Sequence, residues 1–257
     1  MDFKDKVVVI TGASSGIGKE LALQLSRKGS RLVLVARTKQ VLDDLAQRID
    51  PKGEQAIAVQ ADVSKRNHHS KIVEQTLQRF GRLDVYINNA GVSLAQGTLM
   101  ENREEDVRDT LEINFMSAIY SVWAAVPIME KGGGGQLVFV SSCIGKRGVP
   151  LNAVYCSSKF AMQGLTESIR PELRRKNIRV ITLCPPGVNT PFFKNNKKGH
   201  VRTHQLHSVE KIGRQIVRAL EKEKREVLLT FDSKALHWLN VFFPRMMDWA
   251  LARNKKI

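Results

Sequence analysis

The chain has 257 residues, of which 42% are hydrophobic and 26% are charged. This balance is typical of a soluble globular protein and excludes a disordered or fibrous chain. The length is enough to bury the core of one large α/β domain. No uninterrupted apolar run approaches the roughly 20 residues of a membrane-spanning helix, and residues 1–6 lack the apolar stretch of a secretion signal.

The formal net charge of +16 would suit nucleic acid, an anionic membrane surface or anionic small ligands. The basic residues are spread along the chain, and no basic run is interleaved with aromatic residues, which argues against a nucleic-acid partner. Cys143, Cys156 and Cys184 form an odd count without metal-ligand spacing. We therefore expect these cysteines to serve in packing, in a reducing, cytoplasmic compartment.

A buried-strand pattern at residues 7–10 leads into a glycine-rich turn and a helix-like stretch at 19–28. These are the parts of a dinucleotide-binding unit, in which glycines let backbone N–H groups approach a pyrophosphate at a helix N-terminus. The spacing Gly12-x-x-x-Gly16-x-Gly18 departs from the G-x-G-x-x-G fingerprint, and a purely structural turn is the alternative. The expected cofactor contacts of this turn are Gly12, Ser14, Ser15, Gly16, Ile17 and Gly18.

Arg37 follows the second strand pattern, at residues 32–36. An acidic residue at this place would bond the 2′-hydroxyl of an adenosine ribose, whereas an arginine suits a 2′-phosphate. No Asp or Glu lies within residues 32–40. The sequence therefore predicts NADP(H) as the cofactor, with an ordinary surface arginine as the alternative.

Strand patterns continue to alternate with helix patterns along the chain, which predicts a Rossmann-type, doubly wound parallel sheet of the α/β class. The further strands are expected at 56–61, 83–87, 137–140, 179–183 and 227–229, and the further helices at 41–49, 72–80, 107–129 and 159–175. Ligands bind beyond the carboxyl ends of such strands. The residues expected there are Gly12, Arg37, Asp62, Asn89, Ser142 and Pro185.

Tyr155 and Lys159 lie one helical turn apart, on one face of the helix that we expect to follow. A lysine ammonium near a phenol favours the phenolate and would lower the tyrosine pKa toward neutrality, where the tyrosine can transfer protons. The Ser142 hydroxyl, at a strand end, could hold a substrate oxygen beside the phenol. Alone, each residue is as easily an ordinary helix or surface residue, so the pair gains weight only from a cofactor site elsewhere.

Together these residues resemble the short-chain dehydrogenase/reductase family over about residues 5–192. The matching motifs are Thr11-Gly12-x-x-x-Gly16-x-Gly18, Asp62-Val63, Asn88-Asn89-Ala90-Gly91, Asn114, Ser142 and Tyr155-x-x-x-Lys159. The resemblance implies a Rossmann fold, a nicotinamide cofactor and reversible hydride transfer between an alcohol and a ketone.

The resemblance also implies a role for each matching residue. Tyr155 would be the general acid that protonates the carbonyl oxygen, Lys159 would bind the nicotinamide ribose and lower the Tyr155 pKa, and Ser142 would bond the substrate oxygen. Asn114 would support a water-linked proton relay, with a buried bridging amide as the alternative. Further cofactor contacts are implied for Asp62, Val63, Asn89, Ala90, Gly91, Tyr155, Lys159, Pro185, Val188 and Thr190.

One loop departs from the family's pattern. Val188 and Thr190 match, but Pro186 stands where a glycine is expected, which predicts a stiffer loop because proline fixes φ and removes a donor. The Pro-Pro pair resembles the branch that reduces 3-ketosphinganine. Beyond it, residues 191–210 are expected to form a substrate lid. This segment contains His200, His204 and His207, but no carboxylate or cysteine joins these histidines, so we favour a lid over a metal site.

The C-terminal extension, residues 233–257, contains two apolar, Trp-bearing segments separated by Pro244 and flanked by basic residues. Such segments could pack on the main domain, residues 1–232, join a partner subunit, or lie on an anionic membrane surface. The family resemblance implies a homodimer or homotetramer.

We expect an NADPH-dependent reductase of a hydrophobic, lipid-like ketone. One alternative is a dehydrogenase that works toward oxidation of an alcohol. The other is a non-catalytic, NADP-binding scaffold.

Overall fold

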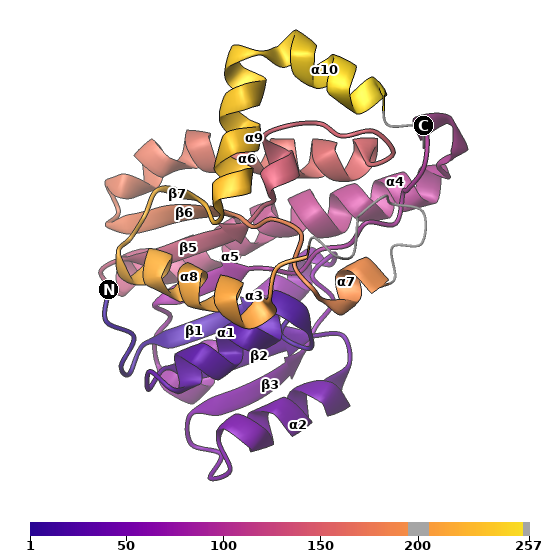
Figure 1. The fold of residues 1–257 in the computed structure, drawn as a ribbon. Helices are drawn as coiled ribbons and strands as arrows, with labels where there is room; N and C mark the ends of the chain where they lie inside the picture. The colour runs from indigo at the N-terminus through magenta and orange to yellow at the C-terminus, as the bar shows by residue number, and fades with distance from the viewer. Residues whose placement is uncertain (195–205, 254–257) are drawn as a thin grey trace.

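The computed structural model describes residues 1–194 and 206–253. Within these residues one parallel sheet has the strand order β3-β2-β1-β4-β5-β6-β7 (Figure 1). The strands are β1 (Val7–Thr11), β2 (Arg31–Ala36), β3 (Ala56–Gln60), β4 (Val85–Asn88), β5 (Gly135–Val140), β6 (Ile178–Cys184) and β7 (Glu226–Leu228). The order reverses between β1 and β4, which creates a topological switch point. The predicted Rossmann-type, doubly wound sheet is confirmed.

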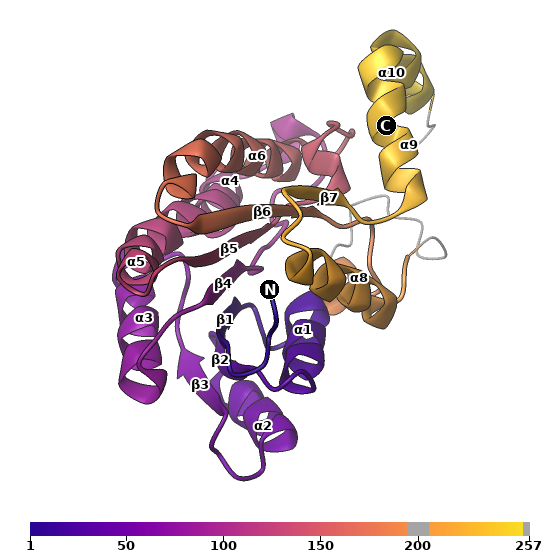
Figure 2. The same cartoon turned by 90° about the vertical axis from the view of Figure 1, so that its left-hand side faces the viewer.

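Helices cover both faces of the sheet (Figure 2). On one face lie α1 (Gly16–Ser26), α2 (Lys39–Ile49) and α8 (Val209–Glu221), which bury Leu21, Leu42 and Ile212 against the strands. On the other lie α3 (Arg66–Phe80), α5 (Ser117–Lys131) and α6 (Ala153–Arg174), which bury Ile72, Met129 and Met162. Each such side chain contributes about 1.5–3 kcal/mol. Burial on both faces explains why the strands read as continuous apolar runs.

Several boundaries differ from the sequence prediction; helix α6, for example, begins at Ala153 rather than at residue 159. Helix α3 begins at Arg66 rather than at residue 72, because its polar first turns carry no apolar period. His69, in those turns, is nevertheless buried and contacts the Val63 carbonyl and the Tyr86 hydroxyl. Gly135, expected in a turn, begins β5 by pairing with β6.

Residues Glu104–Lys131 form one continuous helix of 28 residues. It comprises α4 (Glu104–Leu111), a π-helical segment (Glu112–Met116) and α5. Among the described residues, it is the one helix whose length and composition would allow it to cross a membrane, although the sequence contains no uninterrupted apolar run of that length. Here α5 packs against α3 and the sheet and buries Ala118 and Ala125, so it serves as a core helix.

Helices α9 (Phe231–Phe242) and α10 (Pro244–Ala252) protrude from the body in both views (Figures 1 and 2). We call these two helices the arm. In the described part of the arm, Ser233 is the one buried residue. Of the three alternatives for this extension, packing of its apolar residues on the main domain is therefore not what the structure shows.

Candidate active site

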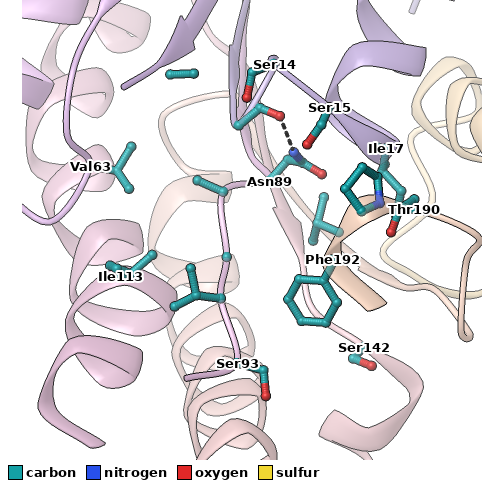
Figure 3. A pocket seen from close by; sticks show the side chains of 18 of the residues that line it. Ser14, Ser15, Ile17, Val63, Asn89, Ser93, Ile113, Ser142, Thr190 and Phe192 are labelled. Atoms are coloured by element: carbon teal, nitrogen blue, oxygen red, sulfur yellow. Dashed lines mark hydrogen bonds between the residues drawn. The ribbon is translucent and has the colours of Figure 1, made fainter. Parts of the chain in front are cut away.

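A cavity of about 520 Å³ lies at the carboxyl edge of the sheet, around the switch point between β1 and β4 (Figure 3). All six expected strand ends contribute to its lining. Of the residues singled out from the sequence, it is lined by Gly12, Ser14, Ser15, Gly16, Ile17, Arg37, Asp62, Val63, Asn89, Ala90, Gly91, Ser142, Tyr155, Lys159, Pro185, Val188 and Thr190. The structure thus gathers residues from six loops and from helix α6 at one place.

The turn between β1 and α1 is shaped for an anion. Gly12 and Gly16 adopt positive φ angles of 67° and 55°, which other residues rarely reach. Helix α1 begins at Gly16, and within the described structure its N-cap Ser15 makes no side-chain capping bond and its first turn holds no acidic residue. The first N–H groups of the helix therefore remain available to a phosphate, and the turn fits a dinucleotide.

Gly18, expected among the cofactor contacts, does not line the cavity. It is buried, and a Cβ atom placed on it would lie 2.3 Å from the Gly12 carbonyl oxygen and 2.6 Å from Asn89 Nδ2. In the structure Gly18 lets α1 pack directly under the glycine-rich turn.

Thr11 and Asn89 fasten the ends of β1 and β4 to each other. The Thr11 hydroxyl donates to the Ile87 carbonyl (3.2 Å) and accepts from the N–H groups of Asn89 (3.0 Å) and Ala90 (3.1 Å). The Asn89 amide donates to the carbonyls of Thr11 (2.9 Å) and Gly12 (3.4 Å; Figure 3). These bonds fix the cavity floor, and sequence reasoning gave Thr11 no such structural role.

Asp62 and Arg37 lie near each other at the rim. Asp62 Oδ1 accepts from the N–H (2.9 Å) and the hydroxyl (2.8 Å) of Ser64. Burial acts to raise the pKa of Asp62, but the Ser64 bonds and the positive charges of Arg37 and Lys65 hold it below its ordinary value. Among the described residues Arg37 forms no ion pair, whereas Lys39 is paired with Asp43 at 2.6 Å. Because Arg37 also lines the cavity, its guanidinium is a basic group available to a ligand there.

Tyr155 lies in the first turn of α6, and the Lys159 ammonium lies 5.6 Å from its ring centre. Lys159 is buried and donates to the Val140 carbonyl at 3.0 Å. The Ser142 side chain, at the start of a short 3₁₀ turn (Cys143–Gly145), lines the same cavity as the Tyr155 phenol and acts to lower the pKa of that phenol. The predicted grouping of these three side chains is what the structure shows.

The predicted lowering of the Tyr155 pKa is not found. Burial raises the pKa of Tyr155, and the nearby Ser142 side chain offsets this only in part. Burial also lowers the pKa of Lys159, to about 8. At neutral pH the phenol is therefore protonated, and most Lys159 side chains still carry a charge.

Asn114, the other expected catalytic residue, sits in the π-helical segment and is buried behind the cavity rather than lining it. Its amide accepts from the Val92 N–H and donates to the Val92 carbonyl, both at 2.8 Å, and donates to the Ser158 hydroxyl at 3.0 Å. A Cβ atom on Gly91 would lie 3.2 Å from Asn114 Oδ1 and 3.5 Å from Lys159 Nζ. Asn114 is thus a bridging amide that supports the wall beside Lys159.

Several lining residues were not identified as site residues from the sequence. Phe192, placed only in the expected lid, has its ring 5.6 Å from the Tyr155 ring. The apolar residues after Asn88-Asn89-Ala90-Gly91 could have been identified from the sequence, because that motif already placed their loop at the expected cofactor site. The lining residues missed in this way are Ala36, Thr38, Ala61, Val92, Ser93, Leu94, Gln96, Ile113, Val140, Ser141, Pro186, Pro191 and Phe192.

Most of the expected lid, including His200 and His204, lies outside the described residues. Its described beginning is the short helix α7 (Pro191–Lys194). At its other end the His207 backbone pairs with the loop at Val188, and its imidazole lies 3.5 Å from the Asp232 carboxylate. Within the described ranges no three metal-ligating side chains form a cluster.

The three cysteines surround the site as free thiols. Burial raises the pKa of each, that of Cys184 to about 12. They are therefore protonated at neutral pH, which fits packing rather than nucleophilic chemistry.

Comparison with known proteins places this geometry in a family. The sequence pattern described as short chain dehydrogenase matches residues 6–200. An uncharacterized oxidoreductase of Bacillus subtilis, YxnA, is 37% identical over 254 residues, which cover 95% of this chain and 71% of that protein. The 11-beta-hydroxysteroid dehydrogenase A of Sesamum indicum is 34% identical over 266 residues, 96% of this chain and 75% of that protein.

Solved structures agree. The alcohol dehydrogenase of the archaeon Thermococcus sibiricus, complexed with 5-hydroxy-NADP, is similar with a TM-score of 0.78 and 29% identity over 87% of this chain and 95% of that one. A short chain dehydrogenase/reductase of Burkholderia phymatum, in complex with NAD, matches in fold with a TM-score of 0.86 and 24% identity over 96% of both chains. The chain therefore belongs to the short-chain dehydrogenase family and is a nicotinamide-dependent oxidoreductase.

Proposed function

We propose that this enzyme uses NADPH to reduce a hydrophobic ketone to a secondary alcohol. The observation that carries the proposal is the grouping of Ser142 and Tyr155 in the wall of the dinucleotide-shaped cavity, with buried Lys159 behind them. When bound, the nicotinamide supplies the hydride. The protein's part is to hold the ketone oxygen and to protonate it.

The protonation state of Tyr155 favours the reductive direction. Because its pKa is raised, the phenol carries its proton at neutral pH and can donate it to the developing alkoxide as a general acid. The Ser142 hydroxyl would bond the same oxygen. The Lys159 ammonium would bind the nicotinamide ribose hydroxyls and stabilise the phenolate left after the transfer.

Distinct parts of the cavity would hold the parts of the cofactor. The turn from Gly12 to Ile17 would bind the pyrophosphate, Asp62 and Val63 would contact the adenine, and Asn89 to Gly91 would line the adenosine ribose. Pro185, Val188 and Thr190 would lie beside the nicotinamide, and Arg37 would pair with the 2′-phosphate of NADPH. Support for NADPH comes from the unpaired guanidinium of Arg37 among the described residues and from the 5-hydroxy-NADP bound to the Thermococcus sibiricus enzyme.

The remaining wall supports a hydrophobic substrate. Leu94, Ile113, Pro186 and Phe192 line the cavity together with the catalytic group, and Leu94 is 44% exposed. One relative, from Sesamum indicum, is named as a dehydrogenase of a hydroxysteroid, an apolar alcohol. A lipid-like ketone such as 3-ketosphinganine, suggested by the Pro185-Pro186 pair, would be a hydrophobic substrate as well.

The test has two steps. Titration of nicotinamide fluorescence should show tighter binding of NADPH than of NADH, and a panel of ketones of increasing chain length should show NADPH oxidation that rises with apolar length. Faster turnover with NADP⁺ and the matching alcohols would favour the oxidative dehydrogenase. Tight NADPH binding without turnover of any ketone or alcohol would favour the non-catalytic scaffold.

We further propose a cytoplasmic homodimer or homotetramer in which residues 1–232 form the catalytic unit, residues 191–210 the substrate lid and residues 233–257 the extension. Exposed aromatic side chains on two neighbouring helices, Trp123 of α5 and Phe160 of α6, support self-association. Sedimentation velocity of the purified protein would give the subunit number, and a monomer at every concentration would contradict this part.

A further inference from the structure

The arm presents apolar side chains that the body does not cover. Trp238 is 55% exposed, Phe242 67% and Trp249 59%, and the rings of Trp238 and Phe242 stack on each other at 5.8 Å. Further exposed apolar residues of the arm are Phe231, Leu239, Val241, Phe243 and Met246. A groove of about 670 Å³ separates the inner side of α10 from α6. So large an apolar surface on two short helices marks an interaction site.

The acidic side chains of the arm pair with the body, whereas its described basic side chains form no ion pair. Both acidic side chains pair with the body: Asp232 lies 3.5 Å from His207, and Asp248 forms an ion pair with Arg147. In the described residues none of the three basic side chains, Lys234, Arg245 and Arg253, pairs with a carboxylate. Arg253 lies over the ring of Trp249, 4.2 Å from its centre. The outward charge of the arm is therefore positive.

Arg147 holds this arrangement in place. Besides its ion pair with Asp248, it donates to the Asn240 side chain at 2.7 Å, and Asn240 donates to the Lys146 carbonyl at 3.4 Å. Polar contacts thus attach one side of both helices to the body. The apolar residues and the unpaired basic residues remain free to meet a partner.

We propose that the α9–α10 arm docks the enzyme on the surface of an anionic lipid bilayer. Tryptophan side chains favour the boundary between headgroups and acyl chains, because the ring is apolar and its N–H is polar. Basic residues beside them attract anionic headgroups, each by roughly a factor of five in affinity. The sequence beyond the described part adds Lys255 and Lys256, and the whole chain carries a net charge of +16. An apolar protein partner would not call for this excess of positive charge.

The base of the arm joins the loops of the cavity. His207, which pairs with Asp232 of α9, also pairs through its backbone with Val188 in the cavity wall. Ser233 of α9 lies close enough to Cys143, the neighbour of Ser142, to influence the pKa of its thiol. Docking would therefore place the cavity beside the bilayer, which suits a lipid-like ketone. The docking itself does not depend on the proposed reaction.

The experiment is co-sedimentation of the full chain with phosphatidylcholine vesicles, with and without phosphatidylglycerol. Wild-type protein should bind the anionic vesicles at least about tenfold more tightly than the neutral ones. Arg245→Glu/Arg253→Glu and, separately, Trp238→Ser/Trp249→Ser should each weaken binding to anionic vesicles by about tenfold or more. Tyr155→Phe should bind vesicles as well as the wild type does, even if it turns over no ketone.

Matched controls separate the arm from the general basicity of the protein. Arg48→Glu/Lys52→Glu makes the same change in net charge at exposed sites near the far end of α2, and Val41→Ser removes an apolar side chain that is 38% exposed on α2. Both should bind anionic vesicles like the wild type. An equal loss in the controls, or no vesicle binding by the wild type, would overturn the proposal. So would an arm variant that changes the subunit number in sedimentation velocity and leaves vesicle binding intact, because the arm would then join copies of the chain.

Discussion

A Cβ atom on Gly18 would lie 2.3 Å from the carbonyl oxygen of Gly12. Backbone atoms block it there, so a larger residue can be accommodated only if α1 moves away from the glycine-rich turn. This close packing explains why Gly18 shapes the cavity without lining it.

Gly18→Ala should therefore lower the free energy of unfolding by about 1–3 kcal/mol and weaken NADPH binding, because the turn and α1 would separate. Gly164→Ala is the matched control, since Gly164 is an exposed helical glycine whose Cβ would meet no atom within 4 Å. It should raise the free energy of unfolding by about 0.5–1 kcal/mol. Urea unfolding and fluorescence titration measure both quantities, and an unperturbed Gly18→Ala protein would contradict the packing argument.

Tyr155→Phe should lower kcat by about 10²–10⁴-fold, because it removes the proton donor and keeps the ring against Phe192. The Kd for NADPH should stay within about threefold of wild type, since the lost hydroxyl is one contact among many. Tyr120→Phe removes a phenol that donates to Glu112 at 2.8 Å, away from the cavity, and should leave kcat unchanged. Near-normal turnover by Tyr155→Phe would exclude this tyrosine as the general acid.

Arg37→Asp should weaken NADPH binding by about 10- to 100-fold, the equivalent of one charge-assisted bond to phosphate, and should leave NADH binding equal or tighter. Lys39→Asp introduces the same charge change two residues away, at a side chain already paired with Asp43, and should alter the ratio far less. The measurement is the NADPH to NADH ratio of Kd values. If Lys39→Asp shifts this ratio more than Arg37→Asp does, the 2′-phosphate site lies at Lys39.

Burial of Lys159 should make stability depend on pH. Its pKa is about 8 in the folded protein and 10.5 when exposed, so the unfolded chain binds more protons between these values. The cost to folding stability of burying the charged Lys159 is therefore full below pH 8, and it disappears as the pH rises to 10.5. Between pH 7 and 9.5 the ligand-free wild type should gain about 2 kcal/mol of unfolding free energy relative to Lys159→Met. If the unfolding free energies of the wild type and Lys159→Met change in parallel with pH, Lys159 is not desolvated.

The sequence alone was sufficient for the sheet and most of the site. All the expected strands exist, because strands buried on both faces must be apolar throughout, and that requirement is local. The same holds for the carboxyl-end residues and for Tyr155 and Lys159, whose spacing places them one turn apart on any helix. Boundaries marked only by polar residues, such as the start of α3 at Arg66, were misplaced.

Tertiary structure decided whatever depends on contacts between distant segments. The π-helical segment that turns Asn114 toward Val92, the ring of Phe192 against Tyr155, and the close approach of the Asn89 amide to Gly18 each join residues far apart in the chain. The raised pKa of Tyr155 has the same origin, because burial by the whole fold outweighs the lysine one turn away. From its composition, the arm could equally pack on the domain, join a partner subunit or lie on a membrane. Only the folded chain shows which side of the arm faces solvent, because Arg147 binds Asp248 and the tryptophans remain exposed.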